Sequence, residues 1–70
     1  MAVNLMLRNN GGGNVVVDLI DSYGGNFSAE IMAGMSQNQS LMEGSEVMLN
    51  GMSVHLVSLD DEGQEIVIAE

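Results

Sequence analysis

Three polar side chains in the C-terminal half have the types that acid–base chemistry needs: Glu46, Ser53 and His55. The dipeptide Asn50-Gly51 between alternating residues predicts a tight hairpin, which would place Glu46 opposite His55, close enough for a charge-assisted hydrogen bond. Ser53 would share the strand face of His55. Catalysis would also need a nucleophile or second acid and a concave site, and no feature of the chain supplies them. We therefore interpret Glu46 and His55 as a structural pair, with a pH-sensitive contact as the alternative, and expect no enzyme.

Four carboxylates gather around one turn near the C-terminus: Asp60, Asp61, Glu62 and Glu65. Oxygen-rich turns can bind Ca²⁺ or Mg²⁺, but a calcium loop of the helix-loop-helix kind needs acids at alternate positions, a Gly sixth and a Glu twelfth. This turn lacks that spacing, so we expect a solvated loop and no metal. The same four carboxylates are our candidates for contact with a partner.

The run from Asn9 to Asn14 contains three consecutive glycines and precedes an apolar segment. A phosphate-binding loop needs its glycines at defined spacing, a helix behind them and usually a Lys, and this chain has no Lys. We therefore expect a mobile hairpin loop here and no cofactor. Cysteine is also absent, which excludes disulfides and thiol chemistry.

Charge narrows the classes of partner. Ten carboxylates stand against one Arg, giving a net charge of −9 at pH 7. Affinity for nucleic-acid phosphates comes mainly from Lys and Arg, and an anionic membrane would repel the chain, so we expect neither partner. No run of 18 apolar residues occurs, and residues 1–7 lack the basic start and long apolar stretch of a secretory signal. A soluble, cytoplasmic protein is expected.

The chain is short but apolar enough to fold. Its 70 residues are 46% hydrophobic, which argues against disorder and predicts one small β domain over residues 1–70. A core below about 70–80 residues seldom supplies more than about 3–5 kcal/mol. Without disulfides or a metal, self-association is the remaining source of stability, so a homo-oligomer is expected.

Alternating apolar and polar residues predict strands over most of the chain. Residues 3–7 alternate with a period of two, residues 14–22 are rich in branched residues typical of a central strand, and residues 64–69 are the last strand. The polar run Ser36–Ser40 predicts a surface loop.

Residues 27–35 have two interpretations. They alternate as a strand does, but Phe27, Ile31 and Met35 also fall at a spacing of four, which suits a helix. We prefer the strand, because Gly34 disfavours a helix, and the helix stays open as the alternative.

Turn chemistry predicts how the strands pair. A loop of Gly24–Asn26 would place Tyr23 opposite Phe27 and Leu19 opposite Ile31, so that apolar faces coincide. The Asn50-Gly51 turn gives four further pairs: Leu49 with Met52, Met48 with Ser53, Val47 with Val54, and Glu46 with His55.

A last hairpin turn is expected at residues 60–63. It would leave four apolar side chains on one shared face: Val57, Leu59, Ile66 and Ile68. The pattern is typical of an all-β fold, a small antiparallel barrel or sandwich of five to six short strands joined by Gly-rich hairpins.

Function is predicted from charge on such a framework. We expect a non-catalytic acidic protein-binding module that docks on a basic protein surface, for instance that of a nucleic-acid-binding protein. Carboxylates on a rigid sheet can resemble the charge array of a duplex, a strategy of small acidic viral inhibitors, so a phage or mobile-element inhibitor is one form of this hypothesis. The alternative is a self-assembling structural subunit, such as a virion or ring component, whose Met-rich and apolar faces bury against copies.

Overall fold

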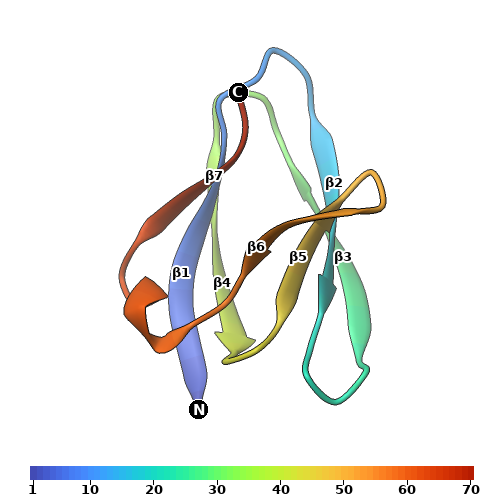
Figure 1. Ribbon diagram of the computed structural model, residues 1–70. Helices are drawn as coiled ribbons and strands as arrows, with labels where there is room; N and C mark the ends of the chain where they lie inside the picture. Colours follow the sequence, from blue (N-terminus) through green and yellow to red (C-terminus); the bar gives the residue numbers. More distant parts are fainter.

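The computed structural model describes residues 1–70 and is all-β, apart from one turn of 3-10 helix. Seven strands form two sheets, of order β4-β1-β7 and β3-β2-β5-β6 (Figure 1). The elements are β1 Ala2–Asn9, β2 Val15–Ile20, β3 Asn26–Ile31, β4 Ser36–Met42, β5 Glu46–Leu49, β6 Met52–Leu56, η1 Leu59–Asp61 and β7 Glu65–Ala69. The all-β class is confirmed, whereas the expected strand number is too low. The two sheets are separate and do not close into a barrel. No helix has the length and hydrophobicity needed to cross a bilayer.

One apolar core joins the two sheets. Because successive side chains of a strand point to opposite faces, alternate residues of β1 and β2 reach it. The core side chains come from both sheets and from the segment after β6: Val3, Leu5, Leu7, Val17, Leu19, Ile31, Leu41, Val47, Val57 and Ile68. The outer face of each sheet is therefore left for polar contacts or partners.

The polar run Ser36–Ser40 is part of strand β4, so the predicted loop is wrong. It pairs along β1, with Leu7 opposite Gln37 and Leu5 opposite Gln39. The two amides satisfy each other, since Gln39 Nε2 donates to Gln37 Oε1 at 2.7 Å. A strand whose core-facing positions are mostly amides carries no apolar alternation, which is why its sequence resembles a loop.

The β2–β3 hairpin confirms the predicted strand over residues 27–31, whereas residues 32–35 form a turn between β3 and β4, so the strand is wrong for that part. The predicted register is also wrong. Leu19 lies opposite Phe27 rather than Ile31. The turn is longer than predicted because Asp21 organises it. Two backbone N–H groups donate to Asp21 Oδ1 at 2.8 Å, those of Tyr23 and Gly25. The change in register is an even number of residues, so the same faces still meet.

The β5–β6 hairpin has the predicted turn and then departs from the predicted register. Asn50 and Gly51 have φ angles of 53° and 78°, as a two-residue hairpin turn with both φ positive requires. Leu49 pairs with Met52 as expected. A β-bulge at Val54 then disrupts the ladder.

The bulge changes which side chains face the core. His55 lies opposite Val47, whose side chain is buried, and Leu56 lies opposite Glu46. The predicted pairing of Glu46 with His55 is therefore wrong. Ser53, opposite Met48, lies on the other face of the sheet from His55. A bulge re-aims the residues that follow it.

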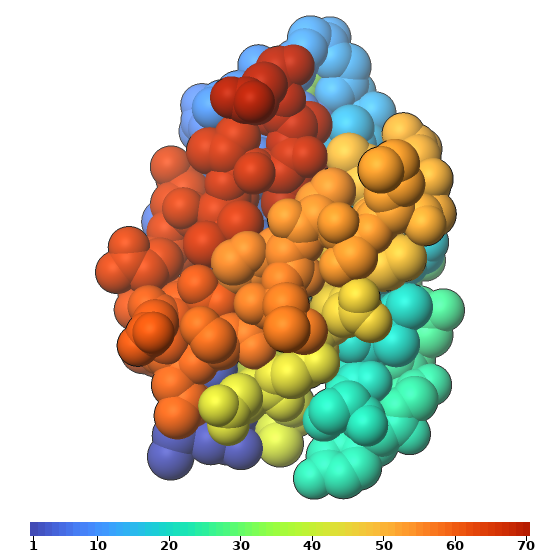
Figure 2. All heavy atoms as spheres, in the orientation of Figure 1, coloured from blue at the N-terminus to red at the C-terminus, as the bar shows by residue number.

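Strand β7 does not pair with β6. It crosses to the other sheet, where it runs parallel to β1 with Leu7 opposite Ile66, so the predicted hairpin at residues 60–63 and the purely antiparallel arrangement are wrong. Two backbone bonds hold its start on β1: Gly63 N–H to Asn4 O at 2.7 Å and Met6 N–H to Gln64 O at 2.9 Å. In Figure 2 the residues from β6 to the C-terminus, orange to red, cover much of the visible face.

Three of the four apolar residues expected on one face reach the core, and the fourth does not. Ile68 and Val57 are buried in the core, and Ile66 is half-buried. Leu59 begins η1 and is exposed, so the expectation is wrong for that residue.

The glycine-rich run after β1 joins the two sheets, so it is not a hairpin loop. Its organiser is Asn9, which is fully buried. Asn9 Nδ2 donates to Gly13 O at 2.8 Å and to Ile31 O at 3.0 Å, and Asn9 Oδ1 accepts the N–H of Gly11 at 2.9 Å. One side chain thus holds the loop against the end of β3.

Candidate functional site

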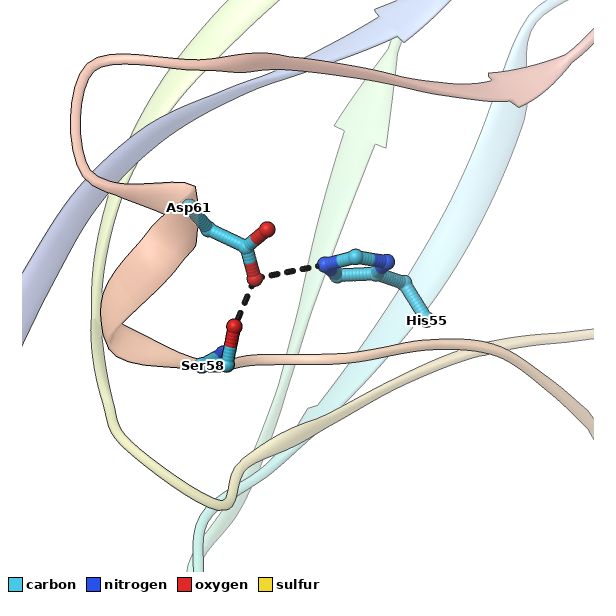
Figure 3. A network of polar contacts seen from close by, with 3 residues as sticks. All are labelled: His55, Ser58 and Asp61. Atoms are coloured by element: carbon cyan, nitrogen blue, oxygen red, sulfur yellow. Dashed lines mark hydrogen bonds and ion pairs between the residues drawn. The ribbon is translucent and has the colours of Figure 1, made fainter.

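The acidic turn, residues 58–65, is built around the carboxylate of Asp61. Asp61 is the third residue of η1, and its Oδ2 accepts the backbone N–H of Ser58 at 2.9 Å. The same oxygen is 2.7 Å from His55 Nε2 on β6 (Figure 3). An acid three residues after a Ser is the capping pattern of a helix start. The spacing of Ser58 and Asp61 is therefore a sequence signal for the bond between the Ser58 N–H and Asp61 Oδ2. A search for alternating strand residues does not detect this signal.

The contact with Asp61 determines which ring nitrogen of His55 carries a proton. Burial raises the pKa of Asp61, but the Ser58 N–H bond, the His55 hydrogen bond and the His55 charge together lower that pKa below its ordinary value. An ionised carboxylate only accepts hydrogen bonds, so His55 Nε2 carries the proton and donates. The side chain of Asp61 is 12% exposed and that of His55 is 23% exposed. The pair therefore lies at the rim of the core, partly shielded from water.

This geometry ties the turn to β6 rather than assembling reactive groups. Ser53 lies on the opposite face from His55. Ser45 is fully buried, and its Oγ has no hydrogen-bond partner. No group of three or more His, Asp and Glu side chains is placed so that it could hold a metal ion. The hydrogen bond to Asp61 holds the imidazole of His55 in one orientation.

The four acids proposed as partner contacts occupy different environments. Asp61 is 9% exposed and its charge is used inside the molecule. Asp60, Glu62 and Glu65 are exposed. Glu62 Oε1 accepts the N–H of Asn4 at 3.1 Å, which orients its carboxylate beside β1. Asp61 therefore does not belong to the exposed set, and contact by the other three stays a prediction.

Glu65 projects from the outer face of the three-stranded sheet. Its Oε2 accepts the hydroxyl of Ser36 at 2.9 Å. Arg8, the only Lys or Arg of the chain, lies on the same face. Arg8 Nη1 donates to Ser36 Oγ at 3.4 Å and Arg8 Nε donates to Asn10 Oδ1 at 2.7 Å. The two charges are thus linked through a hydroxyl rather than by an ion pair.

Two shallow hollows interrupt the surface. One of about 210 Å³ lies at the β3–β4 connection and has six lining residues: Glu30, Ile31, Met32, Met35, Ser36 and Gln37. The other, of about 160 Å³, lies beside the acidic turn: Asn4, Leu5, Met6, Asn38, Glu62, Gly63 and Gln64. Both are smaller than the roughly 300–1,000 Å³ of typical small-molecule sites.

Relatives supply no functional information. No family model matches the chain, and neither a curated protein nor a solved structure matches it.

Proposed function

We propose that this chain is a non-catalytic acidic module that docks on a basic surface of another protein. The observation that supports it is uncompensated charge. Ten carboxylates against one Arg give a net charge of −9 with neutral His, and the contact of His55 with Asp61 engages one of these acids. The remaining acids lie on a body with one Arg to oppose them.

Salt sets how far this charge acts. The extents of the molecule are 33 × 24 × 14 Å, and exposed charges are largely screened beyond the Debye length of about 8 Å at physiological salt. A basic partner close to the surface therefore meets the field of the acids nearest to it, which accelerates encounter and makes association salt-dependent. The accessible surface is 4138 Å², and one side of a standard interface is about 800 Å². One partner would cover about a fifth of the surface.

A rigid framework favours this role further. We infer that the two sheets pack as a small sandwich, so that carboxylates project at set positions. Hydrogen bonds orient several of them: Ser28 Oγ donates to Asp18 Oδ1 at 2.8 Å, and Ser36 Oγ donates to Glu65 Oε2 at 2.9 Å. A nucleic-acid-binding protein offers a basic surface that ordinarily receives phosphates. A phage or mobile-element inhibitor acting in the cytoplasm is one form of this proposal.

Affinity capture with a charge-matched pair of variants tests the proposal. Asp60→Lys/Glu65→Lys reverses two exposed acids of the turn region, and Glu43→Lys/Glu70→Lys makes the same change of net charge elsewhere. Partners captured at low salt should be released at high salt, and the first variant should capture them more slowly than the second. The same partners at both salts, or none at low salt, would count against docking by charge.

Self-assembly as a structural subunit is the second candidate. Large apolar side chains are exposed in several parts of the surface, among them Tyr23 (84%) and Met52 (71%). Burial of such residues against copies would stabilise a small core. Sedimentation equilibrium separates the two proposals, because a stable monomer at micromolar concentration removes this second one.

A further inference from the structure

The outer face of the four-stranded sheet carries an ordered pattern of acids and apolar residues. Val17 and Leu19 of β2 are buried in the core, so the even-numbered residues of β2 point outward. Residues directly opposite in antiparallel strands share a face, and the registers of β2 with β3 and with β5 therefore place every outward side chain of these three strands.

Three acids on this face form a diagonal, the acidic row. The outward residues of β2 are, in order, Val16, Asp18 and Ile20. Glu30 on β3 lies opposite Val16. Glu46 on β5 lies opposite Ile20, so Asp18 stands between the two other acids. Each acid is thus the diagonal neighbour of the next, at a spacing of about 7–8 Å. None of the three is in an ion pair.

Three apolar residues form a second diagonal beside it, the apolar row. Val16 begins it on β2, Met48 lies opposite Asp18, and Leu56 on β6 lies opposite Glu46. Val16 is 55% exposed, Leu56 is 62% exposed and Met48 is half-buried. The face thus presents a line of apolar contacts with a line of carboxylates along one side.

The β-bulge completes the apolar row. An unbroken hairpin from Asn50-Gly51 would pair Val47 with Val54 and turn Leu56 toward the core. Because the bulge at Val54 shifts the register, Leu56 points outward and His55 takes the inner position. The His55–Asp61 hydrogen bond of 2.7 Å then holds that arrangement.

We propose that this face binds a basic amphipathic helix of a partner protein, with the helix lying along the apolar row and its Lys or Arg residues reaching the acidic row. The inference rests on the proposed function for the charge of the partner. Two diagonal steps give a row of about 15 Å, which is close to three helical turns of about 5.4 Å each. Apolar residues at positions i, i+4, i+7 and i+11, which span about 16 Å of helix at 1.5 Å per residue, form the matching stripe.

Charge favours this occupant over a second copy of the chain. The face holds three carboxylates and no cation, because Arg8 lies on the other sheet. Two copies joined through it would set acidic rows against each other or against apolar rows, and either arrangement leaves carboxylates buried without a counter-charge. A cationic flank neutralises them.

A designed peptide tests the proposal. The probe is a 14-residue helix with Leu along one stripe and Lys on its flank, and its control is a scrambled peptide of the same composition and charge. In NMR titrations of the isotope-labelled protein, the helix should shift the resonances of Val16, Met48 and Leu56. The scrambled peptide should bind about tenfold more weakly than the helix. Leu56→Asp and the milder Val16→Thr should each weaken the helix, by about tenfold and severalfold.

The matched control is Met52→Asp, an equally exposed residue of the same strand outside the apolar row. It should leave binding of the helix unchanged, and amide spectra report whether each variant is folded. Shifts confined to the three-stranded sheet or to the Met32–Met35 hollow would overturn the proposal. So would a dimer that Leu56→Asp dissociates, because the face would then be a self-interface.

The two proposals fail in different ways. If the scrambled peptide binds as tightly as the helix and salt releases both, docking by charge stands and the helix-binding face is wrong. If neither peptide binds at low salt, both proposals fail.

Discussion

Removing the carboxylate of Asp61 is the most informative perturbation of the fold, because one oxygen of this side chain holds two groups. Oδ2 accepts His55 Nε2–H at 2.7 Å and the Ser58 backbone N–H at 2.9 Å. Asp61→Ala deletes both bonds and leaves the Ser58 N–H of a capped turn without a partner. The expected effect is a large loss of stability from a substitution at the surface rim.

The magnitude follows from the two bonds. A hydrogen bond to a charged group contributes about 1.5–3 kcal/mol, and loss of a cap costs about 0.5–2 kcal/mol. Both side chains are partly solvated, with 23% of His55 and 12% of Asp61 exposed, so the lower part of the combined range applies. We expect the free energy of unfolding to fall by about 2–3 kcal/mol, and the Tm by about 10–20 °C.

Acid should abolish the difference between Asp61→Ala and the wild type. The folded state lowers the pKa of Asp61 because the Ser58 and His55 bonds outweigh the effect of burial. A lowered pKa stabilises the fold above the ordinary carboxyl range, and this contribution disappears as the pH falls through the lowered value. The gap between the two proteins should therefore be full at pH 7, begin to narrow near the ordinary carboxyl pKa of about 4, and close only below the lowered pKa of Asp61.

Urea denaturation of four proteins across pH 3–8 measures both effects. Asp61→Asn keeps an acceptor for Ser58 without the charge and should lose about half as much stability as Asp61→Ala. Asp60→Asn, at an exposed neighbour with no side-chain hydrogen bond, is the matched control and should change little. A wild-type stability for Asp61→Ala at pH 7, or a gap that widens in acid, would refute this explanation of the turn.

Three further substitutions and one control probe the framework, each by chemical denaturation. Asn9→Ala should cost about 3 kcal/mol because it leaves three buried or half-buried backbone groups unpaired, and a loss under about 0.5 kcal/mol would contradict that role. Ser45→Ala should leave stability unchanged or raise it by up to about 1 kcal/mol, because the buried Oγ has no partner; a clear loss would reveal a bond that the structure does not contain. Gly24→Ala should cost about 1 kcal/mol because φ is +92° there, whereas Gly12→Ala, in open space without positive φ, should be neutral.

Local patterns predict much of this fold. Val3, Leu5 and Leu7 alternate, and all three are buried as β1 requires. Asn50 and Gly51 have the positive φ angles that their dipeptide favours. In both cases the residues themselves determine the conformation, so no distant contact is needed to predict it.

Distant contacts explain the features that sequence reasoning missed. Ser36–Met42 is a strand because β1 offers it a full ladder, which its amides do not reveal. The bulge at Val54 coincides with the His55–Asp61 bond across the turn. β7 pairs in parallel with β1 rather than with its neighbour in sequence, and no local period distinguishes the two choices.

In the candidate site, too, some features can be predicted from the local sequence and others depend on distant contacts. Exposure of Asp60, Glu62 and Glu65 agrees with their place in a charged turn, but Asp61 is drawn inward by a His on another strand. The acidic and apolar rows depend on the relative register of β3, β2, β5 and β6. One residue of slip in any hairpin removes them, which is why spacing along the chain does not predict them.

Docking by charge is tested by stopped-flow association with a partner captured from the native host. The association rate should fall steeply between 50 and 500 mM salt while the dissociation rate changes little, because steering by the negative surface controls encounter. An association rate that is the same at both salt concentrations would contradict docking by charge.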